Sequence, residues 1–234
     1  MKRFLAGLLA VVLIILPSTL LAGYETLFGE TQKAAWAIYA REVGGLKAVC
    51  SATAYSSSAT ETRLLTAGHC FVGSDPQRTD FMATQDHKTF VPATLVRNDL
   101  TLRKNARDNS SSLDDYKGHD YAIVSLKAGN QAVVPIGTSN KLTIGEDLVI
   151  VGLPFGFDFL AVQGIVGSKD MSLSTLVWNH YMGANIYIAG GNSGSAVVST
   201  KQKAIVGIVV AGPGGQTSMA IFLPIDLVDA PTIE

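Results

Sequence analysis

The sequence predicts an all-β fold, either a sandwich or a pair of barrels. Short runs of β-forming residues are separated by Gly, Pro, Asn, Asp or Ser, and helical periodicity is rare. A chain of 234 residues can bury the core of one large β domain or of two small ones. Ten such runs follow one another, at 46–55, 63–70, 89–96, 121–127, 147–155, 160–167, 185–191, 195–200, 204–212 and 219–228.

Residues 1–22 have the pattern of a secretory signal peptide. Lys2 and Arg3 precede the apolar run FLAGLLAVVLIIL, which a small-residue cleavage region follows. We therefore expect cleavage after Ala22 and export to the periplasm or the medium. An uncleaved membrane anchor is the alternative, because Leu20 suits a cleavage site poorly and the apolar run can be extended toward spanning length.

Residues 23–45 form an N-terminal segment ahead of the main β-rich region. The apolar spacing in ETQKAAWAIYAREVGG predicts one short amphipathic helix that ends at Gly44 and Gly45. An inhibitory propeptide is the alternative interpretation of the same segment.

The two cysteines are expected to form a disulfide. Cys50 and Cys70 are the only cysteines of the chain, and an exported protein meets an oxidising environment. Closing a loop of this size stabilises a protein by about 3 kcal/mol, mainly through the unfolded chain. Two thiols and four scattered histidines have no metal-ligand spacing, so we expect neither a metal nor another cofactor.

Charge excludes one class of partner. The formal net charge is −1, and no dense run of Lys and Arg with interleaved aromatic residues occurs. Such a chain offers no basic field to a phosphate backbone, so we expect no nucleic-acid binding.

His69 and a glycine-framed serine predict nucleophilic catalysis. The stretch LLTAGHC places His69 directly after a buried strand and beside Cys70, which a disulfide would hold in place. A general base must stay within hydrogen-bond reach of its nucleophile, and a rigid strand end suits that requirement. The stretch GGNSGSAVV, residues 190–198, offers the hydroxyl. A structural histidine that bonds only to backbone groups is the alternative.

Two aspartates compete for the role of orienting the imidazole. Asp99 leads into the charged stretch RKNAR, whereas Asp120 leads into the apolar stretch YAIV. A buried orienting carboxylate should open a buried strand, so Asp120 is favoured over Asp99. The charged, Ser- and Asn-rich segment 97–119 reads as an exposed inserted loop, and His119 as a solvated residue at its end.

The order of these motifs resembles the chymotrypsin-like serine proteases. LLTAGHC, HDYAIVSLK and GGNSGSAVV carry that resemblance, and TIGEDLVIVGLPFGFDFLAVQGIVGS with MAIFLPIDLV is similar to the HtrA-like bacterial branch. The resemblance covers about residues 46–228. It implies two six-stranded antiparallel β-barrels, which we place at 46–132 and 133–234, with the active site in the cleft between them.

Three departures from the HtrA-like pattern accompany the resemblance. We expect no PDZ domain, the loop before Asp120 is long, and Ser195 stands where the family usually has glycine.

The resemblance also implies roles for individual residues. Ser193 is the expected nucleophile, His69 its base and Asp120 the orienting carboxylate, while the amides of Gly191 and Ser193 form the oxyanion hole. Pancreatic-type relatives have an acid at the place of Asn192, which pairs with a newly cut N-terminus. A neutral amide cannot form that ion pair, so we expect activity without N-terminal insertion.

By the same resemblance, the primary substrate pocket lies around Tyr187 and Val210, Ala211 and Gly212. Tyr187 stands where an aspartate would select Lys or Arg, and Val209 and Val210 offer no histidine to bind Glu. We therefore expect an apolar pocket that selects mainly by size. Packing of Tyr187 within the barrel is the alternative.

These observations predict an exported serine endopeptidase that works through an acyl-enzyme and cuts after small or apolar residues in unfolded or flexible proteins. The alternative is a protease-fold binding or scaffolding protein without turnover. An esterase is disfavoured, because esterases of the α/β-hydrolase type place the histidine last in the chain. The expected partners are protein or peptide substrates, with no membrane contact beyond a retained anchor; homo-oligomerisation is left open.

Overall fold

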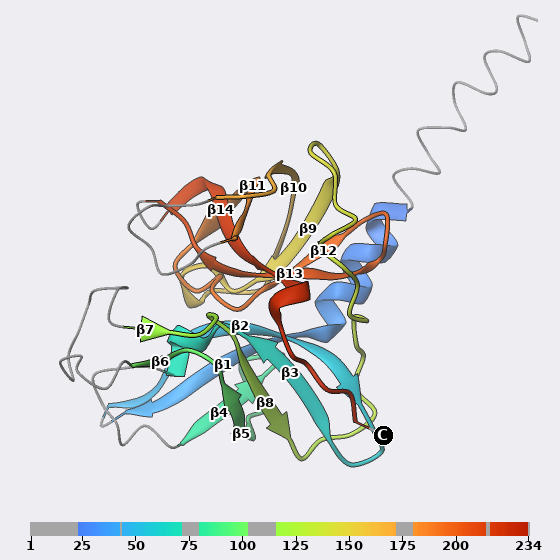
Figure 1. Ribbon diagram of the computed structural model, residues 1–234. Helices are drawn as coiled ribbons and strands as arrows, with labels where there is room; N and C mark the ends of the chain where they lie inside the picture. The colour runs from blue at the N-terminus through green and yellow to red at the C-terminus, as the bar shows by residue number, and fades with distance from the viewer. Residues whose placement is uncertain are drawn as a thin grey trace, which may run out of the picture.

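Two closed antiparallel barrels make up most of the computed structural model (Figure 1). The structure describes residues 23–42, 44–71, 80–102, 116–171, 180–213 and 216–233. The predicted signal peptide, residues 1–22, lies outside this part of the chain.

The first barrel closes in the strand order β1-β2-β3-β8-β5-β4. Every neighbouring pair in it is antiparallel. Its strands are β1 (Ala35–Glu42), β2 (Gly45–Ser57), β3 (Thr62–Thr66), β4 (Phe81–Thr84), β5 (Val91–Asn98) and β8 (Ala122–Leu126).

The second barrel closes in the order β10-β11-β14-β13-β12-β9. Its pairs are also antiparallel, and β9 and β12 are buried along almost their whole length. Its strands are β9 (Asp147–Gly152), β10 (Leu160–Ser168), β11 (Met182–Ala189), β12 (Ala196–Ser199), β13 (Ala204–Ala211) and β14 (Gln216–Pro224).

The predicted all-β fold with two six-stranded barrels is therefore confirmed. All ten predicted runs contain barrel strands, because alternation and turn residues mark most of these strands in the sequence. A small sheet of β6 (Thr101–Leu102) and β7 (Tyr116–Lys117) lies within the predicted loop 97–119. Residues 103–115 lie outside the described part of the chain.

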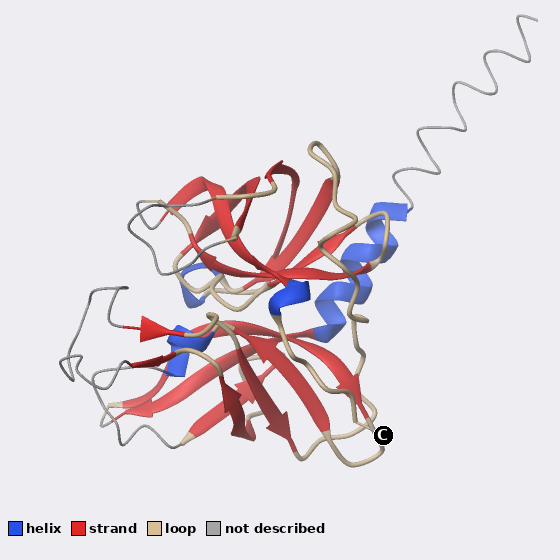
Figure 2. Ribbon diagram, in the orientation of Figure 1, coloured by secondary structure: helices blue, strands red, loops and turns tan. Residues whose placement is uncertain are grey.

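The prediction for the N-terminal segment is wrong after its first turn. Residues 23–34 are helical (Figure 2), but the chain then extends into β1, so the first barrel begins at Ala35 rather than at residue 46. Residues 34–38 are all buried, because β1 pairs with β2 and β4 and also lies against β9 of the other barrel. Burial on both faces removes the alternation that identifies a half-exposed strand.

Both ends of the described chain hold the two barrels together. In the helix at 23–34, the Tyr24 hydroxyl donates to Asp147 at the start of β9, and the Lys33 carbonyl accepts from Gln85 beside β4. At the other end, residues 228–233 leave the second barrel after the 3₁₀ turn η4 (Ile225–Leu227) and run along the first barrel (Figure 1).

This C-terminal tail is bonded to three strands of the first barrel. The Pro231 carbonyl accepts from Tyr55 Oη at 3.1 Å and from Arg63 Nη1 at 3.0 Å, and Asp229 forms an ion pair with Arg97. The Ile233 amide donates to Ser56 Oγ at 2.9 Å.

Among the helices of the described residues, none is long and apolar enough to span a bilayer.

Candidate active site

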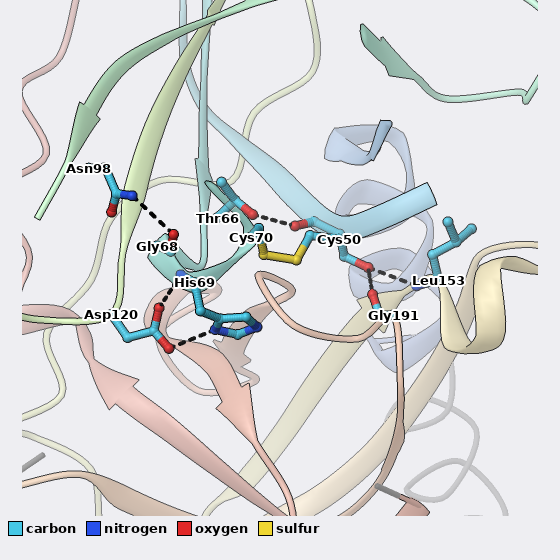
Figure 3. The surroundings of a disulfide bond; sticks show 10 residues. Cys50, Thr66, Gly68, His69, Cys70, Asn98, Asp120, Leu153 and Gly191 are labelled. Carbon is cyan, nitrogen blue, oxygen red and sulfur yellow. Dashed lines mark hydrogen bonds and ion pairs between the residues drawn. A yellow bond between two sulfur atoms is a disulfide. The ribbon is translucent and has the colours of Figure 1, made fainter. Parts of the chain in front are cut away.

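His69 lies in the 3₁₀ turn η1 (Gly68–Phe71), which begins two residues after the end of β3. Asp120 reaches it from the segment just before β8 and accepts two hydrogen bonds, each 2.7 Å long (Figure 3). The His69 amide bonds to Oδ1 of Asp120, and Nδ1 of the His69 ring bonds to Oδ2. The carboxylate is fully buried, whereas 37% of the imidazole surface remains exposed. Asp120 therefore fixes both the backbone and the ring of His69 and leaves the ring accessible.

Two further residues fix this pair. The Asp120 amide donates to Tyr181 Oη at 3.2 Å, and Asn98 Nδ2 donates to the Gly68 carbonyl at 3.1 Å. Burial raises the pKa of Tyr181, so its hydroxyl stays neutral and can accept this bond.

Asp99, the competing aspartate, has different partners. One of its carboxylate oxygens accepts from the His119 amide at 2.8 Å, and the other lies 3.3 Å from Arg97 Nη2. Asp99 therefore stabilises the segment that carries Asp120 and does not contact the imidazole.

Two opposing effects set the pKa of His69. Burial lowers it, but attraction to the Asp120 carboxylate and the hydrogen bond to that group raise it, and the net result is a pKa above the ordinary value of 6.5. The fixed carboxylate at Nδ1 leaves Nε2 as the nitrogen that can accept a proton. A base held in this way is suited to proton transfer near neutral pH.

The predicted nucleophile, Ser193, sits in a turn between β11 and β12. The Asn192 amide donates to the Ala189 carbonyl at 3.1 Å, and the Ser195 amide donates to the Asn192 carbonyl at 3.0 Å. The Ser193 carbonyl accepts from the Ser51 amide of β2 at 2.9 Å, so the turn of the second barrel is bonded directly to the first.

Gly191 could not carry a side chain in this turn. Its φ is +98°, and a Cβ there would lie 2.2 Å from the Leu153 carbonyl oxygen. Within the described residues, the amides of Gly191 and Ser193 donate to no backbone carbonyl. An oxyanion hole requires N–H groups that are not already donated to such internal acceptors.

Ser193 and His69 are not joined by a hydrogen bond in the described part of the chain. Ser193 is half-buried and the imidazole is partly exposed, so both reach the surface. A contact of this kind commonly tightens only when substrate binds.

Asn192 and Ser195 each have a buried polar side-chain atom. Asn192 is 3% exposed and Ser195 is fully buried, and within the described residues Asn192 Oδ1 and Ser195 Oγ have no hydrogen-bond partner. A Cβ on Gly152 would lie 2.2 Å from Ser195 Oγ. Glycine at position 152 therefore makes room for the serine that stands where the family usually has glycine.

The Cys50–Cys70 disulfide is present, and it connects β2 to the turn that carries His69 (Figure 3). The sulfur atoms and a His69 ring nitrogen lie within 4.8 Å of one another. Sulfurs bonded to each other are not thiolates, so this cluster is not a metal site.

The residues predicted for the primary pocket differ in how far they are exposed to solvent. Val210 is buried at 4% exposure, whereas Tyr187 is 38% exposed and falls within a register shift between β11 and β14. A Cβ on Gly212 would lie 2.6 Å from both Ile188 Cδ1 and Thr217 Cγ2. Ile188 and Thr217 therefore pack closely against Gly212, and Ile188 is itself buried.

A cavity of about 590 Å³ lies beside the turn. Gly190 and Gly191 form one wall of it, and Cys50 lies on another. Its remaining lining is mostly apolar, with one cation: Tyr39, Leu46, Lys47, Ala48, Val49, Leu153, Phe155 and Gly156. Space for a bound chain is therefore available directly beside Gly191.

Ser51, Asn98 and Tyr181 also belong to this site but were not predicted from the sequence. Each bonds to a backbone group of a residue far away in the sequence, and the separations are 140, 30 and 61 residues. Without the fold, only the position of Ser51 beside Cys50 offered a signal.

Sequence comparisons find relatives of this chain among known proteins. The chain is 32% identical over 111 residues to a probable periplasmic serine endoprotease DegP-like of Pseudomonas putida, and 29% identical over 136 residues to one of Hahella chejuensis. These matches cover 46% and 57% of this chain but only 23% and 27% of the relatives, so the chain spans about a quarter of their length.

Solved structures share the fold. The HtrA-type protease AlgW with a tripeptide superposes with a TM-score of 0.67 at 19% identity, over 87% of this chain and 60% of that one. The serine endoprotease from Yersinia pestis gives 0.63 at 20% identity, over 87% and 63%. The predicted similarity to the HtrA-like branch is thus confirmed. The trypsin-like peptidase domain family matches residues 50–208, more than half of the 234 residues, and the chain therefore belongs to that family.

Proposed function

We propose that this protein is a serine endopeptidase that uses Ser193, His69 and Asp120. The observation that carries the proposal is the pair of 2.7 Å hydrogen bonds between buried Asp120 and His69. A carboxylate placed in this way holds one tautomer and stabilises the imidazolium that forms during proton transfer.

The proposed reaction gives each of these groups one role. Ser193 Oγ attacks the carbonyl carbon of the scissile bond while its proton passes to His69 Nε2. The carbonyl oxygen becomes an oxyanion, which the amides of Gly191 and Ser193 stabilise. Collapse of this intermediate breaks the C–N bond, and His69 returns the proton to the leaving amine. A water molecule then attacks the acyl-enzyme while His69 takes its proton. His69 returns this proton to Ser193 Oγ as the carboxylic acid is released.

The surroundings of Ser193 support a peptide substrate. The cavity beside Gly191 can hold the chain that follows the scissile bond, whereas a simple ester would leave this space unused. For the residue before the bond, no aspartate stands at position 187 to bind Lys or Arg, so we propose selection of a small or apolar residue there.

Export to the periplasm completes the proposal. A disulfide persists in an oxidising compartment, and the P. putida and H. chejuensis relatives carry the word periplasmic in their names. Unfolded or flexible proteins are the proposed substrates, because an extended segment can occupy the cavity beside Gly191.

The test compares Ser193→Ala with Ser195→Ala. Fluorophosphonate labelling followed by mass mapping should modify Ser193 in the wild type, and casein turnover should be lost in Ser193→Ala. The neighbouring Ser195→Ala should keep both properties, because its hydroxyl is fully buried. A folded wild type that is neither labelled nor active would favour the scaffolding alternative.

A further inference from the structure

We infer that Ser51 is a positioning residue for the oxyanion hole, a role that rests on the proposed function. Ser51 lies on β2 of the first barrel, next to Cys50, and is 1% exposed. The turn that it contacts belongs to the second barrel. Ser51 has no hydrogen bond to His69 or Asp120 within the described residues, so any effect it has on catalysis acts through the turn.

Ser51 binds the turn on both sides of Asn192. Its Oγ donates to the Gly191 carbonyl at 2.8 Å, and its amide donates to the Ser193 carbonyl at 2.9 Å. These carbonyls belong to the two residues whose amides would bind the oxyanion. One residue of the first barrel therefore fixes the backbone on either side of Asn192.

The same hydroxyl also accepts a hydrogen bond. The Leu153 amide donates to Ser51 Oγ at 2.9 Å, and Leu153 directly precedes the 3₁₀ turn η3 (Pro154–Gly156). Two residues later, the Phe155 amide donates to the Gly190 carbonyl at 2.5 Å. The Ser51 hydroxyl thus connects the η3 turn to the oxyanion turn at one point, and Phe155 connects them at a second.

The bond from Phe155 determines where the Gly191 amide points. In a trans peptide the carbonyl and the N–H of one unit face in opposite directions. Because the Gly190 carbonyl faces Phe155, the Gly191 N–H faces away from it. A shift of η3 relative to the turn would rotate this peptide, and the Ser51 hydroxyl opposes such a shift.

Ser51 is itself firmly held. Its carbonyl accepts from Thr66 Oγ1 at 2.7 Å at the end of β3, and the neighbouring Cys50 is in the disulfide. The turn needs this support, because Gly190, Gly191 and Gly194 give it little conformational restriction of its own. The Ser51 hydroxyl therefore stabilises the transition state by holding an amide in place rather than by binding substrate.

The decisive variant is Ser51→Ala, with Ser56→Ala as its matched control. Ser56 lies on the same strand, is 9% exposed and accepts one backbone hydrogen bond from Ile233. We expect kcat of Ser51→Ala to fall about 10- to 100-fold while KM changes by less than about twofold. The control should keep wild-type kcat.

Two additional measurements separate positioning from general damage. Affinity for a peptide trifluoromethyl ketone, whose adduct places an oxyanion in the hole, should fall in parallel with kcat/KM in Ser51→Ala. The pKa of the acidic limb of the kcat/KM profile should stay unchanged, because the bonds between Asp120 and His69 do not involve Ser51.

The inference is overturned if Ser51→Ala retains wild-type kcat, or if inhibitor affinity stays unchanged while kcat falls. It is also overturned if the acidic limb shifts together with kcat. Failure of the proposed function looks different, because the wild type itself would then neither turn over casein nor accept the fluorophosphonate.

Discussion

Asp120 controls His69 through charge as well as geometry. The raised pKa means that the folded protein favours the imidazolium, so this pair stabilises the fold below about pH 6.5, and the contribution is lost as pH rises through the folded pKa. The proposed catalysis has the opposite dependence, because His69 must be neutral to act as a base. Activity should therefore rise with pH through a pKa above 6.5.

Asp120→Asn should separate these effects. Loss of the anion removes both contributions that raise the pKa of His69, so the acidic limb of kcat/KM should move to lower pH. The amide also favours the wrong tautomer, and kcat should fall by about 10⁴-fold. The measurement is a pH–rate profile of peptide hydrolysis for wild type and variant.

Asp99→Asn is the control for this experiment. Its carboxylate bonds to the His119 amide and to Arg97 and does not contact the His69 ring. The acidic limb of the kcat/KM profile should therefore stay at the same pH as in the wild type. An equal loss in both variants would contradict the assignment of Asp120.

The sequence distinguished these two aspartates by the residues on the C-terminal side of each. A buried strand after Asp120 carries the carboxylate inward, and that pattern is local. Tyr181 could not be found in the same way, because its contact with Asp120 depends on how the two barrels meet. Local patterns identify groups at strand ends, whereas the partners of those groups depend on tertiary structure.

At the scale of elements, β1 illustrates why strand prediction fails in a buried position. The segment AWAIYARE contains three alanines, a residue with high helix propensity, and it lacks polar alternation. Pairing with β2 and β4 outweighs that preference. The four-residue β4 was missed for a different reason, because so short a strand offers too few positions to establish a period.

The disulfide joins two elements of the site, and its loss should affect both stability and rate. The double variant Cys50→Ala/Cys70→Ala opens a link with a sequence separation of 20 residues. We expect the free energy of unfolding to fall by about 3 kcal/mol, measured by urea denaturation. The rate should fall as well, because the link holds the η1 turn of His69 beside the β2 strand of Ser51.

Thiol titration provides the check on this prediction. The unreduced wild type should show no reactive thiol after denaturation. Two reactive thiols in that sample, or a double variant with unchanged stability, would contradict the structural role of the link.

At the scale of the whole molecule, the question is whether activity requires trimming of the chain to one defined N-terminus. Asn192 is neutral and buried, while Gly23 at the start of the described helix is exposed. A neutral amide cannot form an ion pair with an N-terminal ammonium, so proteins that begin at Gly23 and proteins with a few added residues there should be about equally active. Turnover of casein by both forms is the measurement.

Activity that appears only after trimming to one defined N-terminus would contradict this prediction. It would also identify the helix at 23–34 and the residues after it as an inhibitory propeptide. Their contacts argue otherwise, because β1 completes the first barrel.

The C-terminal tail has a consequence for the newly made chain. Domains fold as units, and the N-terminal one can close first during synthesis. His69 and Asp120 belong to that first unit, but Ser193 belongs to the second, and the tail that ties the second to the first is made after both barrels. If the proposed triad is correct, a growing chain carries base and carboxylate before it has a nucleophile. Hydrolysis should then begin only when both barrels have emerged, so a nascent chain should not cut itself or its neighbours.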